Sequence, residues 1–96
     1  MEVKKQMELE DMRPCAGWVV ESGGITLCQA GKGAICSIPY PFAVVWDCMV
    51  RRHRTERCIR MFAAVSGTDE DSARRQVVAC LEDWQTKGLV REAGDV

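Results

Sequence analysis

The chain has 96 residues, of which 47% are hydrophobic and 28% charged, a composition typical of one globular domain. Its net charge of −1 provides no general attraction for nucleic acid or anionic lipid, so such a partner would need a local basic patch. The N-terminal segment MEVKKQMELEDMR contains no apolar run typical of an export signal, and the longest apolar run, Phe42 to Trp46, cannot span a membrane. We therefore expect one cytoplasmic domain that does not cross a membrane.

The first part of the chain predicts a flexible tail followed by three short strands. Residues 1–14 alternate charges with scattered methionines, which favours a tail or a frayed helix. Strand-forming runs then cover residues 18–21, 25–29 and 34–38, with glycine-containing turns between them. If the second turn is centred on Gly31-Lys32, two cross-strand pairs place four apolar side chains on one face. These pairs are Leu27 with Cys36 and Ile25 with Ile38.

Apolar spacing then changes to the period of a helix. After Pro41, apolar residues stand at i, i+3, i+4, i+7 and i+8, which predicts one buried helical face. This face consists of Phe42, Val45, Trp46, Met49 and Val50. A chain this short must bury its few large side chains, so we expect five aromatic residues to be largely internal. They are Trp18, Trp46, Trp84, Phe42 and Phe62.

Two more helices and a closing strand are predicted. Thr55 is expected to cap the second helix, which Ser66-Gly67 ends. The third should run from about Asp69 to Thr86, with Thr68 and Asp71 as an approximate capping box and Gly88 as its stop. Residues 89–92 leave room for one short strand. The order of three strands and three helices indicates an α+β domain with a helix-turn-helix core.

The cysteines and the single histidine do not form a recognisable chemical motif. The six cysteines contain no CxxC pair, and His53 lies in a basic turn, so we expect mostly buried, reduced thiols and no metal site. No Ser-His-Asp, Cys-His or paired-carboxylate arrangement can be argued, so we expect no enzyme activity. A thiol-based metal or redox protein remains an alternative, because six cysteines are many for 96 residues.

Three segments resemble the PqqD-like proteins, which are recognition elements for precursors of ribosomally synthesised, modified peptides. The first comprises Ile38 and Ala43-Val44-Val45-Trp46, the second Arg54-Thr55 and Ile59, and the third Asp69-Glu70, Val77, Leu81 and Gly88-Leu89-Val90. The resemblance implies a small winged helix-turn-helix-like domain at residues 15–92, with tails at 1–14 and 93–96. Such a domain needs no cofactor. It binds the leader of a precursor peptide and presents it to a modifying enzyme, often a radical SAM enzyme.

In that family the leader adds as an extra strand beside the third strand, in a groove walled by the third helix. Carried onto this sequence, the strand edge comprises Ala34, Ile35, Cys36, Ser37 and Ile38. The helical wall comprises Arg74, Val78 and Leu81, with Arg75 or Gln85 at its rim. Ile35 faces away from the buried side of the predicted sheet, so it is either a leader contact or an isolated exposed side chain.

Arginines are concentrated between the first and second helices. Arg51, Arg52, Arg54 and Arg57, followed by Arg60, form either a solvated basic face or a contact for the partner enzyme or an acidic peptide. A winged-helix nucleic-acid-binding or transcription-regulating module is the other alternative. It is disfavoured because acidic residues outnumber basic ones on the helix that would enter the major groove.

Overall fold

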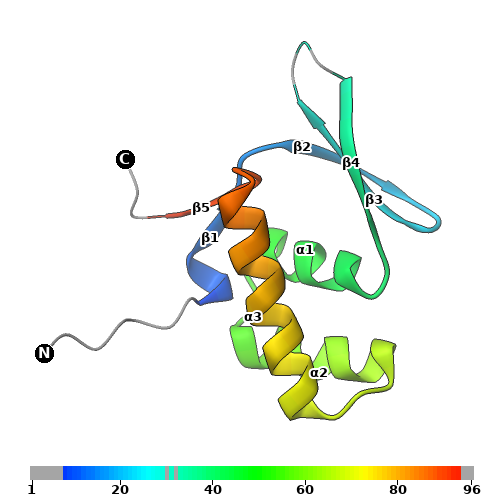
Figure 1. Ribbon diagram of the computed structural model, residues 1–96, viewed down its shortest axis with the longest axis vertical. Coiled ribbons are helices and arrows are strands. Elements are labelled where there is room, and N and C mark those ends of the chain that lie inside the picture. The colour runs from blue at the N-terminus through cyan, green and yellow to red at the C-terminus, as the bar shows by residue number, and fades with distance from the viewer. Residues whose placement is uncertain (1–7, 30, 32, 94–96) are drawn as a thin grey trace, which may run out of the picture.

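The structure, a computed structural model, describes residues 8–29, 31 and 33–93 (Figure 1). Its elements are η1 (Leu9–Asp11), β1 (Met12–Pro14), β2 (Gly17–Glu21), β3 (Gly24–Gln29), β4 (Gly33–Pro39), α1 (Phe42–Val50), α2 (Thr55–Ser66), α3 (Glu70–Thr86) and β5 (Val90–Glu92). The predicted α+β class is confirmed. The described strands form two antiparallel sheets, however, and not the single sheet expected from the sequence.

The larger sheet has the strand order β2-β3-β4, as the three predicted strands require. The predicted register is confirmed, because Leu27 pairs with Cys36 and Ile25 with Ile38. Ile25, Leu27 and Ile38 are buried, whereas Cys36 remains exposed. Because Cys36 is exposed, the helices cover this face of the sheet only in part. The predicted centre of the second turn includes position 32, which lies outside the described residues.

The smaller sheet pairs β1 with β5 and corrects the predicted tail. Leu9 and Met12 are fully buried, and β1 pairs with β5 from Met12 opposite Glu92 to Pro14 opposite Val90. Residues 8–14 therefore belong to the fold, because they supply two core side chains and a strand; residues 1–7 lie outside the described part. At the other end, the Ala93 amide donates to the Asp11 carbonyl at 2.7 Å, and residues 94–96 are not described.

Helix α1 lies between the larger sheet and the other two helices (Figure 1). The predicted face is inside, since Val45, Trp46 and Met49 are buried and Phe42 and Val50 are partly buried. The opposite side is buried as well, through Ala43, Val44 and Cys48. The prediction of a single buried face was therefore incomplete. Helix α1 is buried on two sides because it contacts β1, β4, α2 and α3.

Two predicted helix caps are wrong. Arg54, in an extended conformation, is the N-cap of α2, and Thr55 is the first helical residue. Asp69, not Thr68, caps α3, where its side chain accepts a hydrogen bond from the Ser72 amide at 2.7 Å. Gly67 ends α2, as predicted, and adopts the left-handed conformation.

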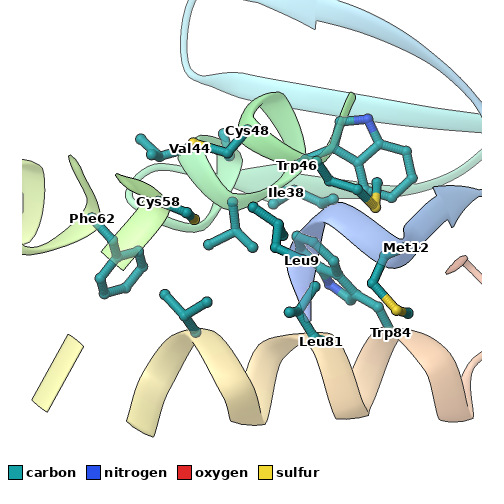
Figure 2. Close-up of a cluster of buried hydrophobic side chains, with 14 of the residues drawn as sticks. Leu9, Met12, Ile38, Val44, Trp46, Cys48, Cys58, Phe62, Leu81 and Trp84 are labelled. Atoms are coloured by element: carbon teal, nitrogen blue, oxygen red, sulfur yellow. The ribbon is translucent and has the colours of Figure 1, made fainter. Parts of the chain in front are cut away.

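The core joins all three helices to both sheets, and Figure 2 shows its central side chains. Trp46 is fully buried and makes an edge-to-face contact with Trp84, with ring centroids 5.4 Å apart. Trp18 was expected inside but is 39% exposed, because β2 lies at the edge of its sheet and only one side of the ring reaches Trp46. No helix in the described part of the chain is long and apolar enough to cross a membrane.

Candidate functional site

A groove of about 420 Å³ lies between β4 and the C-terminal half of α3. One wall is formed by the second half of β4, the other by one face of α3, and α1 and the segment after α3 complete it. The lining residues are Ile35, Cys36, Ser37, Ile38, Pro39, Phe42, Cys80, Asp83, Trp84, Lys87 and Leu89. The groove is thus built from elements at both ends of the fold.

Strand β4 is an edge strand of the larger sheet. In the described residues it pairs with β3 on one side and with no strand on the other. An edge strand presents backbone N–H and C=O groups that can pair with another extended chain. Residues 33–37 are exposed, so this edge is open to solvent.

The inner surface of the groove is apolar and its rim is charged. Trp84 is buried, and Phe42 and Leu89 are partly buried against the core. Asp83 and Lys87 form an exposed ion pair on α3, with 3.0 Å between carboxylate oxygen and Nζ. Cys80 lies in the α3 wall, where burial, followed by the nearby Asp83 charge, raises the pKa of its thiol to about 12. The thiol is therefore neutral at physiological pH and adds to the apolar wall.

The structure brings together the strand side of the predicted site. Ile35, Cys36, Ser37 and Ile38 all line the groove, whereas Ala34 is exposed on β4 outside the lining set. Ile35 is 39% exposed and is one of the residues that line the groove. Ile38 is buried, so a ligand there would meet mainly its backbone.

The helix side of the predicted site is displaced along α3. Arg74 and Val78 do not line the groove, and Leu81 is fully buried in the core, so it cannot form an open wall. Arg74 instead makes a two-bonded ion pair with Glu56 of α2, at 2.6 and 2.7 Å. The proposed rim residues Arg75 and Gln85 are also outside the lining set.

The helical wall consists of Cys80, Asp83 and Trp84 of α3 and its C-cap residue Lys87, a set that was not predicted from the sequence. Their spacing of i, i+3, i+4 and i+7 places them on one helical face, and this pattern could have identified them. Helix α3 also packs against α2, where Arg74 bonds to Glu56 and not to the groove.

The arginine cluster is separate from the groove. Arg51, Arg52, Arg54 and Arg57 are exposed at the junction of α1 and α2, and none of them lines the groove. Arg51 forms an ion pair with Asp47 at 3.1 Å. For the other three, no ion pair occurs within residues 8–29, 31 and 33–93. The cluster therefore retains positive charge at the surface of the described part of the chain.

The six cysteines are free, but they are less buried than expected. Cys48 and Cys58 are fully buried, whereas Cys15 and Cys36 are exposed because they lie next to or on edge strands. A hydrogen bond from Cys58 is the largest influence on Cys48 and lowers the pKa of its thiol, while burial and Asp47 oppose this effect. As the partner in that bond, and because it is buried, Cys58 has a raised pKa.

Among the described residues, no group of three or more His, Cys, Asp or Glu side chains could hold a metal ion. Comparisons of the chain with known protein families, with curated proteins and with solved structures find no significant match. The candidate site therefore depends on the geometry described above and on the resemblance found in the sequence.

Proposed function

We propose that this chain is a peptide-binding domain that receives the leader of a ribosomally synthesised precursor peptide as an added strand along β4. The observation that carries the proposal is the edge of β4, which pairs with no strand of the described residues and lies beside an apolar groove walled by α3. Backbone hydrogen bonds to β4 would supply affinity, and the groove would select alternate side chains of the bound strand. The motif resemblance to PqqD-like proteins independently suggests the same strand and helix.

The groove favours a leader segment with apolar side chains. Every second residue of an added strand points to the same side, and Phe42, Trp84 and Leu89 provide an apolar surface for those residues. The Asp83–Lys87 ion pair at the rim offers both charges to flanking polar residues. In this proposal the domain is winged-helix-like: α2, the Gly67 turn and α3 form the helix-turn-helix, and the larger sheet forms the wing.

The partner enzyme is proposed to bind at the arginine cluster. Arg52, Arg54 and Arg57 are exposed and lie outside the groove, so an acidic surface could bind there while the peptide remains in place. Chemistry would then belong to the partner, in keeping with a radical SAM or another peptide-modifying enzyme. The domain itself would be a cytoplasmic chaperone for its peptide.

Titration with synthetic leader peptides tests this function. The peptides are those encoded by short reading frames next to the gene, and the measurement is the amide chemical shifts of the isotope-labelled full chain. We expect one peptide to shift residues 35–38 and the α3 face from Cys80 to Lys87, with smaller changes in α2. Unchanged spectra with all neighbouring peptides would contradict the proposal.

A pair of matched variants locates the binding edge. Ile35→Arg places a charge in the apolar groove and should weaken peptide binding by roughly tenfold or more. Val19→Arg makes the same kind of change on β2, the opposite edge strand, where the side chain is 55% exposed, and should leave affinity unchanged. If Val19→Arg weakens binding and Ile35→Arg does not, the peptide binds the β2 edge and the assignment to β4 is wrong.

A further inference from the structure

Three sulfur atoms meet at the contact between α1 and α2. Cys48 of α1 donates a hydrogen bond through Sγ to Met61 Sδ of α2 at 3.8 Å. Cys58 lies one helical turn before Met61 on the same helix, and it has the largest influence on the pKa of the Cys48 thiol. Figure 2 shows Cys48 and Cys58 on their two helices. The three side chains therefore form one sulfur cluster, which the peptide groove does not use.

The Cys48–Met61 contact has the spacing expected at a metal ion bound by three sulfur atoms. A metal–sulfur bond of about 2.3 Å in a trigonal plane requires sulfur atoms about 4 Å apart. The Cys48–Met61 distance of 3.8 Å is close to that value, so these two sulfur atoms already have the spacing that a shared ion requires. Two thiolates and a thioether are soft ligands, which select Cu(I), whereas structural zinc requires four ligands.

We propose that Cys48, Cys58 and Met61 bind one Cu(I) ion. On binding, the two S–H bonds break and two protons leave, two copper–thiolate bonds and one copper–thioether bond form, and copper remains in the +1 state. The resulting site carries a net charge of −1. The positive charges of Arg57 and Arg51 act on Cys48 and would balance it, against the opposing Asp47, which is itself paired with Arg51.

The positions of the three residues provide an entry path. Cys48 and Cys58 are fully buried, whereas Met61 is 36% exposed. An incoming ion would meet the thioether first and then pass to the two thiols beneath it. The site would therefore be closed to bulk solvent once occupied, in contrast to the exposed thiols of Cys15 and Cys36.

Anaerobic titration with the Cu(I)–acetonitrile complex, in competition with bathocuproine disulfonate, tests the site. The protein is the full chain with the other four cysteines replaced, which removes competing thiols. These changes are Cys15→Ser, Cys28→Ser, Cys36→Ser and Cys80→Ala. We expect one Cu(I) per monomeric chain and, by X-ray absorption, three sulfur neighbours at about 2.3 Å. Copper that does not saturate at one ion, or that joins two chains, would overturn the proposal.

Two methionine variants separate ligation from packing. Met61→Leu keeps the apolar volume but removes the thioether, and should weaken Cu(I) binding by roughly tenfold or more and reduce the sulfur neighbours to two. Met12→Leu makes the same change in a fully buried methionine of β1, and should leave binding unchanged. Equal affinity in Met61→Leu and the parent chain would assign the copper to another place. Cys48→Ala and Cys58→Ala should each abolish saturable binding, with circular dichroism as the check on folding.

Discussion

Trp46 connects the larger sheet to the third helix. Its ring is fully buried and lies 6.1 Å from the Trp18 centroid and 5.4 Å from the Trp84 centroid. Its indole N–H has no hydrogen-bond partner within the described residues. The packing of the ring, and not a polar contact, therefore holds this residue in place.

Replacing Trp46 tests that interpretation. Trp46→Ala should lower the free energy of unfolding by about 3–5 kcal/mol, because it leaves a large cavity between the sheet and α3. Trp18→Ala should cost clearly less, since Trp18 is 39% exposed. Trp46→Phe should also lower the free energy of unfolding by less than Trp46→Ala, because it keeps an aromatic ring and removes the unpartnered N–H donor. Urea denaturation of the three variants measures these differences, and equal losses for Trp46→Ala and Trp18→Ala would contradict the assignment.

Thr55 connects the N-terminal segment to the start of α2. Its hydroxyl oxygen accepts from the Leu9 amide at 2.8 Å, and its hydroxyl can donate to Glu8 or Glu10 at 3.0 or 2.9 Å. Burial acts to raise the pKa of Glu10, but hydrogen bonds from backbone and from Thr55 outweigh it, so the pKa is lowered from its usual 4.5. The sequence suggested only a cap at Thr55, because the partner segment lies more than forty residues away.

This contact predicts a pH dependence of stability. A lowered pKa means that the unfolded state binds the Glu10 proton more readily, so the contribution is full above pH 4.5 and is lost as pH falls through the folded-state value. Thr55→Val should make the free energy of unfolding depend less on pH in the acid range. At neutral pH it should lower the free energy of unfolding by about 1–3 kcal/mol, because the Leu9 amide loses its partner. Thr55→Ser keeps the hydroxyl and is the control. Urea midpoints between pH 3 and 7 measure the effect; parallel profiles for Thr55→Val and the parent chain would contradict it.

Helix α3 ends in the manner that its sequence predicts. Gly88 has a φ of 76°, the Leu89 amide donates to the Trp84 carbonyl at 2.9 Å, and the Gly88 amide donates to Gln85 at 3.1 Å. These two bonds satisfy the last carbonyls of the helix and direct the chain into β5. The same turn places Leu89 at the end of the groove.

Gly88→Ala should therefore destabilise the domain through its backbone conformation. An L-residue in the left-handed region costs about 1–2 kcal/mol, and no atom lies near the added methyl group, so no clash adds to this cost. Gly23→Ala is the matched control, since Gly23 also has open space but no positive φ. Thermal unfolding should show a lower midpoint for Gly88→Ala alone. A similar decrease in both variants would mean that the turn conformation is not responsible.

At the scale of elements, local signals predicted those parts of the fold that depend on neighbouring residues. The period of α1, the glycine stops at Gly67 and Gly88, and the register of Ile25 with Ile38 could all be predicted, because each depends on nearby residues. The β1–β5 sheet could not, since its strands have three residues each and pair across the whole chain. Leu9 and Met12 were too few to indicate burial among charged neighbours.

The candidate groove shows the same difference between local and long-range contacts. Its strand wall was predicted because β4 is a continuous run of strand-forming residues, whereas its helical wall was predicted too near the start of α3. Which turns of a helix face a groove depends on where its neighbours pack, and Arg74 is committed to Glu56 of α2. The sequence of α2 or of α3 alone does not indicate which turns of the two helices pack together.

The whole molecule separates its charges in a way that bears on nucleic-acid binding. In a helix-turn-helix, α3 would enter the major groove of DNA. Its exposed residues include the acidic Glu70, Asp71, Glu82 and Asp83 but only one exposed basic residue, Arg75, with Lys87 following as the C-cap. The cluster of Arg51, Arg52, Arg54 and Arg57 lies outside α3, from the end of α1 into α2. A duplex against α3 would therefore bring phosphates close to carboxylates.

We accordingly expect the full chain not to retard a mixed-sequence DNA duplex even at about 50 mM salt, where phosphate contacts are strongest. The double variant Glu70→Lys and Asp71→Lys reverses the charge of the first turn of α3, and should gain weak, salt-sensitive binding that shows the assay can detect it. Retardation by the parent chain that falls steeply with salt would instead favour the nucleic-acid alternative. The groove proposed to bind the leader peptide uses the C-terminal half of α3, whereas this charge reversal lies in its first turn. If that proposal is right, the double variant should bind the peptide with the same affinity as the parent chain.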